Sequence, residues 1–147
     1  MQIDQEVHEF LMRHLGSIFE NDLETYHATT SEELTLYEWF VTPHRLDGLP
    51  FHDFMMSESG RRGTVFGGGD HETGQAINMR FDLSNLHIQR YNDTAIASYT
   101  LLVSTGSGDG VSVTAHNESR VMVRIDGEWM VVHVHKSPAW AAPHTQP

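Results

Sequence analysis

The 147-residue sequence lacks cysteine and has little positive charge. The absence of cysteine excludes disulfide bonds and thiolate chemistry. Nine lysine and arginine residues, of which only Lys136 is a lysine, stand against twenty acidic residues and give a formal net charge of −11. Because nucleic acids and anionic membrane surfaces are bound through basic patches, this balance argues against both as partners.

Long apolar runs are also missing. No segment approaches the roughly 20 apolar residues that a membrane-spanning helix needs, and the N-terminus lacks the basic and apolar segments of a secretion signal. We therefore expect a soluble, cytoplasmic protein. The length fits a single domain, which we place at residues 1–137, followed by an extended, proline-rich tail at 138–147.

The N-terminal third carries helical periodicity. Apolar residues recur every three or four positions, at Ile3, Val7, Phe10, Leu11, Leu15, Ile18 and Phe19. With Asp4 as N-cap, this spacing predicts an amphipathic helix over residues 5–20. Shorter elements are predicted after it: a helix at 22–27, a loop at 29–33, a strand at 34–40, a turn region at 43–48, and a helix at 51–56 opened by Pro50.

Residues 57–75 are rich in glycine and polar side chains. Gly67, Gly68 and Gly69 have the composition of a phosphate-binding loop, but neither a lysine nor a helical pattern follows them. We therefore expect a surface loop here rather than a nucleotide site.

The second half of the chain has β patterning. Strands are predicted at residues 77–83, 86–90, 94–104, 111–124 and 128–136. Turn signals separate them at Asn92-Asp93, at the glycines 106, 108 and 110, and at Asp126-Gly127. Helices followed by a long antiparallel sheet predict an α+β fold, in which a long helix packs across a strongly curved sheet and leaves an open-mouthed cone.

The hairpin at residues 118–136 combines apolar alternation with charged side chains. If Asp126 and Gly127 form its whole loop, Arg120 shares a face with Trp129, Val131, His133 and His135. A three-residue loop with a bulge instead places Arg120 with Val132, Val134 and Lys136. The sequence leaves both registers open.

Two spaced motifs are long enough to compare with known families. The first, LTLYEWFVTPHRLDGLPFHDF at residues 34–54, has a leading Leu-Thr, an aromatic-Glu pair, a later Gly and a closing Phe-His-x-Phe. The second comprises Glu118, Arg120-Val121, Asp126-Gly127, Trp129 and residues 132–137. Both resemble the association (hub) domain of calcium/calmodulin-dependent protein kinase II. The resemblance covers essentially the whole chain, and it is loosest between residues 57 and 85.

This resemblance implies a nuclear transport factor 2-like, or SnoaL-like, cone whose partner is another copy of itself, in a homodimer or a ring-like oligomer. The sequence contains no kinase domain, and the family's calmodulin-binding segment lies outside the matched region. We therefore expect a stand-alone, bacterial relative that does not phosphorylate substrates and does not bind calmodulin.

The resemblance also implies a cavity lined by a glutamate, a histidine and arginines. Glu38 and Arg120 match two of these positions, and Lys136 stands where the family usually has an arginine. His87 matches the cavity histidine if one residue is inserted, whereas Leu101 replaces another arginine. The predicted ligand-binding pocket therefore consists of Glu38, His87, Tyr99, Arg120, His133 and Lys136.

A guanidinium beside an orienting glutamate suits a small carboxylate anion. The alternative is a buried ion pair that only organises the core. His133 and His135 share a strand face, but two histidines do not complete a metal site, so we predict neither a metal nor a cofactor.

Two hypotheses for function follow. The first is a homo-oligomerisation domain with a small-anion pocket and no catalytic residue. The second is a cone-fold enzyme of isomerase, cyclase or dehydratase type acting on a small acid or polyketide-like substrate, with Glu38, His87, Tyr99 or His133 moving protons.

Overall fold

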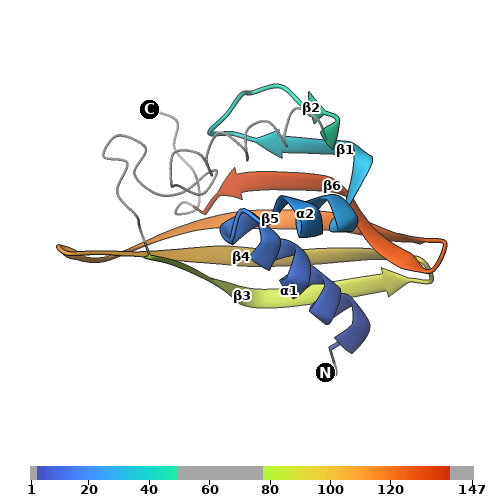
Figure 1. The fold of residues 1–147 in the computed structure, drawn as a ribbon, viewed down its shortest axis with the longest axis horizontal. Helices are drawn as coiled ribbons and strands as arrows, with labels where there is room; N and C mark the ends of the chain where they lie inside the picture. The colour runs from blue at the N-terminus through green and yellow to red at the C-terminus, as the bar shows by residue number, and fades with distance from the viewer. Residues whose placement is uncertain (1–2, 50–77, 140–147) are drawn as a thin grey trace.

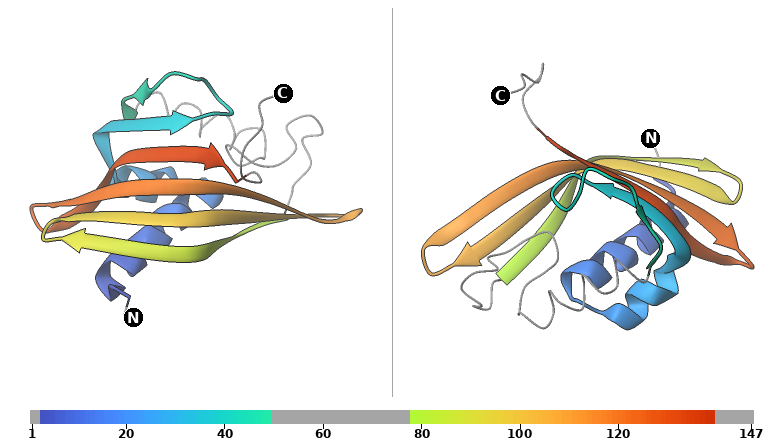
Figure 2. Two further views of the ribbon diagram at one scale, coloured as in Figure 1. Left: turned by 180° about the vertical axis from the view of Figure 1, so that it is seen from behind. Right: turned by 90° about the horizontal axis from the view of Figure 1, so that it is seen from above.

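The structure, a computed structural model, describes residues 3–49 and 78–139. In chain order the elements are α1 (Gln5–Phe19), α2 (Leu23–Thr29), β1 (Thr30–Glu38), β2 (Leu46–Asp47), β3 (Asn78–Tyr91), β4 (Thr94–Ser107), β5 (Gly110–Ile125) and β6 (Glu128–Pro138). The strands form one sheet in the order β2-β1-β6-β5-β4-β3, with both helices on the same face (Figure 1). The sheet arches over α1 and α2, as the α+β prediction requires (Figure 2).

The two helices begin where the sequence predicts. The Asp4 carboxylate accepts a hydrogen bond from the Val7 N–H at 3.1 Å, and Asp22 caps α2 through the Thr25 N–H at 3.2 Å. The apolar stripe of α1 lies in the core, where it meets the inner face of the sheet. The core residues are Val7, Leu11, Leu15, Ile18, Tyr26, Leu34, Leu36, Leu49, Ala95, Ala97, Tyr99, Leu101, Val103, Met122, Trp129, Val131 and Val134.

The sheet is antiparallel except where β1 meets β6. These two strands run parallel, and Leu36 pairs with Val134 while Glu38 pairs with Lys136. The expected antiparallel arrangement therefore holds for the other strand pairs of the described sheet. A parallel pair is possible here because β2 to β5 separate β1 from β6 in the chain, so that no short hairpin joins the two strands.

Several strand boundaries differ from the predictions, and β2 lies within the predicted turn region at 43–48. Residue Thr30, expected in a loop, already pairs with Val131, and the register of β1 then shifts before Thr35. Strand β3 is continuous where two strands were predicted, because a bulge between Ser84 and His87 absorbs the interruption. The predictions for the helix at 51–56, the loop at 57–75 and the tail beyond residue 139 lie outside the described residues.

The hairpin of β5 and β6 has a register that differs from both alternatives. Asp126 and Gly127, with φ of 52° and 82°, form a two-residue loop. The register then shifts between Val121 and Met122, so that Val132 is an extra residue in β6. Because one extra residue reverses the alternation, four side chains of β6 on either side of it are buried in the core: Trp129, Val131, Val134 and Lys136.

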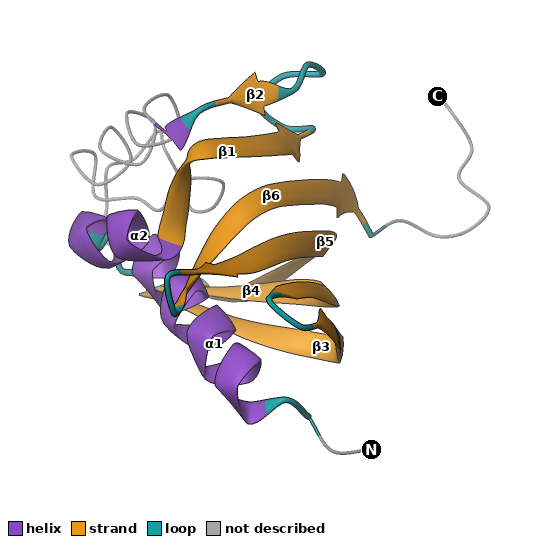
Figure 3. Ribbon diagram, turned by 90° about the vertical axis from the view of Figure 1, so that its right-hand side faces the viewer, coloured by secondary structure: helices purple, strands orange, loops and turns teal. Residues whose placement is uncertain are grey.

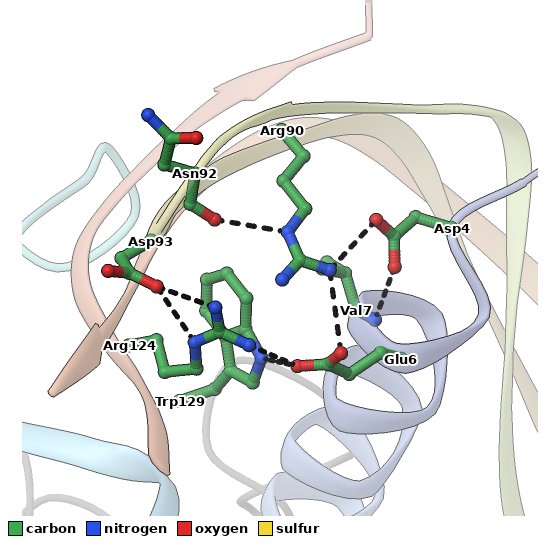
Figure 4. A network of polar contacts seen from close by, with 8 residues as sticks. All are labelled: Asp4, Glu6, Val7, Arg90, Asn92, Asp93, Arg124 and Trp129. Atoms are coloured by element: carbon green, nitrogen blue, oxygen red, sulfur yellow. Dashed lines mark hydrogen bonds and ion pairs between the residues drawn. The ribbon is translucent and has the colours of Figure 1, made fainter. Parts of the chain in front are cut away.

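The start of α1 is fastened to the sheet by a group that we call the Trp129 latch (Figure 4). Its residues are Asp4, Glu6, Arg90, Arg124 and Trp129. The Trp129 Nε1–H donates to Glu6 at 2.6 Å, and the guanidinium carbons of Arg90 and Arg124 lie 5.1 and 5.4 Å from the centre of the Trp129 ring. Arg90 also pairs with Asp4 at 3.2 Å, which links the helix cap to β3.

Within the described ranges, no helix is long and apolar enough to cross a membrane.

Candidate functional site

Ionisable side chains meet on the inner face of the sheet, across β1, β6, β5 and β4. We call this group the inner charge cluster; it consists of Glu38, Tyr99, His116, Glu118, Arg120 and Lys136. Backbone pairing brings its members together, because Lys136 of β6 lies between Glu38 of β1 and Glu118 of β5. Glu118 in turn lies opposite Tyr99 of β4.

Glu118 is at the centre of the cluster. Its Oε1 accepts a hydrogen bond from Tyr99 Oη at 2.7 Å and another from Arg120 Nη1. Its Oε2 lies 2.6 Å from His116 Nε2 and 3.9 Å from Lys136 Nζ. Arg120 Nη1 also donates to Tyr99 Oη at 2.6 Å. Glu118 of β5 thus contacts β4 through Tyr99 and β6 through Lys136.

A second ion pair completes the cluster. Lys136 Nζ donates to Glu38 Oε2 at 2.7 Å and lies 5.7 Å from the centre of the Phe40 ring. The four charged residues are 0 to 9% exposed. Charges buried this deeply persist only when they are paired, and here two carboxylates face two cations.

The pKa values in the cluster show which groups keep their charge. Burial alone would raise the pKa of Glu118, but Arg120 and Lys136 hold it well below its usual range. Burial alone would lower the pKa of Arg120, and the neighbouring Glu118 more than offsets this, so its pKa is raised. Burial raises the pKa of Tyr99 well above its ordinary value, so this residue stays a neutral phenol that donates to Glu118.

The structure brings four of the six predicted pocket residues together: Glu38, Tyr99, Arg120 and Lys136. His87 and His133 lie on the outer face instead. The bulge in β3 turns His87 outward, beside Ser98, where it lines an open hollow of about 270 Å³. His133 Nδ1 is 2.7 Å from Thr35 Oγ1, and burial together with the nearby His135 lowers the pKa of His133.

Two members of the cluster, Glu118 and His116, were not among the predicted pocket residues. The alternation of the sequence could have identified both, because they precede Arg120 at intervals of two residues and therefore share its face on a regular strand. His116 lies opposite Leu101, the position at which the resemblance implies an arginine. The imidazole of His116 thus lies at the edge of the cluster, opposite the position where Leu101 replaces the implied arginine.

The cluster retains hydrogen-bonding capacity. Among the described residues, Arg120 Nε has no hydrogen-bond partner, although this atom is buried. A planar guanidinium uses such a donor to hold a carboxylate oxygen. In the described part of the chain, no group of three or more histidine, cysteine, aspartate or glutamate side chains is placed to hold a metal ion.

Comparisons with known proteins identify the family and the fold of this chain. The model of the calcium/calmodulin dependent protein kinase II association domain family matches residues 3–140. The association domain of Caenorhabditis elegans CaMKII is 23% identical, with a TM-score of 0.72 and coverage of 90% of this chain and 93% of that chain.

Other structures show the same fold at lower identity. An NTF2-like protein from Cytophaga hutchinsonii is 16% identical, with a TM-score of 0.67 over 92% of this chain and 99% of that chain. A protein described as a putative ketosteroid isomerase from Shewanella frigidimarina is 14% identical, with a TM-score of 0.64 over 88% and 92% of the two chains. The two helices and curved mixed sheet thus form an NTF2-like cone, and the chain belongs to the calcium/calmodulin-dependent protein kinase II association domain family.

Proposed function

We propose that this chain is a homo-oligomerisation domain that pairs with further copies of itself through the outer face of its sheet. Membership of the association domain family, over residues 3–140, is the observation that carries this proposal. Self-assembly also fits the layout of the molecule, because α1 and α2 lie together on one side of the sheet and leave the opposite side to other contacts (Figure 3).

The outer face has the composition of an interface. Along β5 the outward positions include Val111, Val113 and Ile125, which are 75, 60 and 51% exposed. Val121, at the middle of the sheet between Ile96 and His133, is half-buried and also points outward. Exposed apolar side chains on a sheet face gain free energy when another protein covers them.

The variant Val121→Lys tests the assembly. A lysine at the centre of a paired sheet face would be buried without a partner, so we expect the variant to dissociate to the monomer. The wild-type chain should have a mass that is a multiple of the monomer mass in multi-angle light scattering at micromolar concentration. The matched control is Gln5→Lys, which makes the same charge change on the exposed side of α1.

Circular dichroism should show the same fold for the wild-type chain and both variants. A wild-type chain that is monomeric at all concentrations would contradict the proposal. A Val121→Lys variant that stays assembled would reject the outer face as the interface.

We further infer that the inner charge cluster binds a small monocarboxylate. The donors in support are Arg120, with its unoccupied Nε, and Lys136, while Glu38 and Tyr99 hold them in place. Calorimetric titration with small acids measures this binding.

The electrostatics favour binding over catalysis. A carboxylate with a strongly lowered pKa is a weak base, and Glu118 is held in that state by its neighbours. Tyr99 is a poor proton donor because its pKa is raised well above its ordinary value. The cluster is thus suited to recognise an anion rather than to abstract a proton.

A further inference from the structure

A separate hollow of about 900 Å³ lies at the junction of α2 and β1, and we call it the α2–β1 hollow. It shares no described lining residue with the inner charge cluster. Its lining is polar where α2 runs into β1 and apolar where the residues after β2 and those of β6 contribute: His27, Thr30, Ser31, Glu32, Glu33, Leu49 and Met130. A hollow of this size accommodates a small molecule rather than a folded partner.

An irregularity in β1 brings two neighbouring carboxylates to this hollow. On a regular strand, Glu32 and Glu33 would point to opposite faces of the sheet. The register of β1 against β6 shifts between Thr30 and Thr35, so the regular alternation is interrupted here. The Glu33 N–H also donates to Ser31 Oγ at 3.1 Å, a local contact that competes with regular strand pairing. Both glutamates consequently line the same hollow.

The two carboxylates have no cation of their own. Within residues 3–49 and 78–139, neither Glu32 nor Glu33 forms an ion pair, and both are exposed. Like charges on adjacent residues repel each other, and a bound cation relieves that repulsion. The formal net charge of −11 also raises the concentration of cations near this surface.

A buried hydroxyl next to the carboxylates also lacks a partner. Thr30 is 1% exposed and lines the hollow, and its Oγ1 has no hydrogen-bond partner among the described residues. An unpaired buried hydroxyl is unfavourable, and a donor supplied by a ligand removes this cost. Rotation about the Cα–Cβ bond presents Oγ1 to a donor in the hollow.

We propose that the α2–β1 hollow binds a small aliphatic polyamine. Alkylammonium groups are cationic at physiological pH and carry only donors, which suits carboxylates and an unpaired hydroxyl oxygen. The ammonium groups pair with Glu32 and Glu33, and one of them also donates to Thr30 Oγ1. The alkyl chain covers Leu49 and Met130, as the stem of a lysine covers apolar surface.

The lining favours an organic cation over a metal ion. In the described part of the chain, no group of three or more histidine, cysteine, aspartate or glutamate side chains is placed to hold a metal ion. An apolar wall also contributes nothing to metal binding, whereas it stabilises an alkyl chain. The proposal depends neither on self-assembly nor on the anion site, because the hollow has its own residues.

Isothermal titration calorimetry of the full chain at pH 7.5 and low ionic strength tests the proposal. The probes are spermidine and putrescine, with butylamine as a single-charge analogue, butanediol as an uncharged analogue and magnesium chloride as a metal. We expect one spermidine per chain, bound about tenfold more tightly than butylamine because a second ion pair forms. Butanediol should show no binding heat, and magnesium should bind more weakly than putrescine.

Variants of the carboxylates and the hydroxyl locate the site. The double variant Glu32→Gln/Glu33→Gln should weaken spermidine binding about tenfold, since both ion pairs are lost. Thr30→Val should weaken it about threefold, because valine keeps the shape of threonine without the acceptor. The matched control Glu20→Gln/Glu128→Gln makes the same charge change at exposed positions outside the hollow and should retain the wild-type affinity.

Each result supports or overturns the polyamine site. Equal weakening by the two double variants would show that spermidine responds to net charge alone, and this overturns the site. Absence of binding heat, or magnesium binding as tightly as putrescine, also overturns it. Unchanged affinity in Thr30→Val overturns the role of the hydroxyl. If circular dichroism shows that Thr30→Val does not fold, Thr30→Ala replaces it, and the glutamate variants decide independently.

Discussion

At the scale of single residues, the stability of the molecule depends on the pairing of the charges that are buried in its core. Glu118 is 3% exposed and contacts Tyr99, His116 and Arg120 directly. Removing one member of a buried ion pair leaves the other desolvated and uncompensated, which costs more than the pair contributed. The stability of the inner face should therefore respond strongly to this one carboxylate.

We expect Glu118→Ala to lower the free energy of unfolding by about 3–5 kcal/mol, because it strands the Arg120 guanidinium in the core. Urea denaturation at fixed protein concentration, followed by circular dichroism, measures the change.

The control is Asp82→Ala, which removes the partner of Arg80 from an ion pair whose side chains are 78 and 53% exposed. An exposed pair of this kind contributes less than about 1 kcal/mol. Equal losses for the two variants would show that the cluster does not depend on Glu118.

At the scale of elements, the Trp129 latch holds the first turn of α1 against the sheet (Figure 4). The hydrogen bond from Trp129 is the largest cause that lowers the pKa of Glu6, and Arg90 and Arg124 add to it. The backbone N–H of Val7 is the largest cause that lowers the pKa of Asp4. Both carboxylates thus bind protons less readily in the folded chain than in the unfolded chain.

This sign predicts that acid releases the latch. A lowered folded-state pKa means that the stabilisation is complete above the unfolded values, near 4.5 for Glu6 and 3.8 for Asp4, and is lost as pH falls through the folded values. We expect the indole N–H resonance of Trp129 in ¹H–¹⁵N spectra to shift below pH 4.5, and Glu6→Gln to weaken that response. Glu9→Gln, an exposed change one turn along α1, is the control. An indole resonance that is independent of pH would contradict the latch.

The two bulges act at the same scale and decide which residues share a face. The extra residue Val132 lets Trp129 and Lys136 both point inward, although their sequence spacing places them on opposite faces of a regular strand. The bulge in β3 has the opposite consequence, because it directs His87 away from Tyr99. One extra residue in each strand thus adds Lys136 to the cluster and keeps His87 out.

At the scale of the whole molecule, assembly has to overcome repulsion between like charges. Each copy carries a formal net charge of −11. Salt screens repulsion beyond about 10 Å at 0.1 M ionic strength. Burial of the exposed apolar side chains Val111, Val113 and Ile125 at the proposed interface would, in contrast, gain free energy whether or not salt is present.

We therefore expect assembly to strengthen as sodium chloride rises from about 10 to about 150 mM at pH 7.5, because the charges on neighbouring copies are screened. Sedimentation velocity at micromolar concentration measures this change. Tetramethylammonium chloride should act in the same way, since the effect depends on ionic strength. Weaker assembly at higher salt would instead indicate an interface built on opposite charges.

The sequence by itself determined the local features of this protein. Helix α1 begins after Asp4 because the cap and the apolar spacing are neighbours in the chain, and the turn at Asp126-Gly127 needs only its own two residues. Such features depend on interactions within a few residues, which a single sequence displays directly.

Only the tertiary structure decided which side chains meet. The parallel pairing of β1 with β6 places Glu38 beside Lys136, and no local pattern specifies a contact between residues 98 positions apart. The positions of the bulges at Val132 and before His87 are likewise set by tertiary contacts. Each bulge shifts the register by one residue and so reverses which side chains of the strand face the core. The extra residue in β6 is stabilised by burying Val134 and pairing Lys136, contacts that exist only after the sheet has closed over α1.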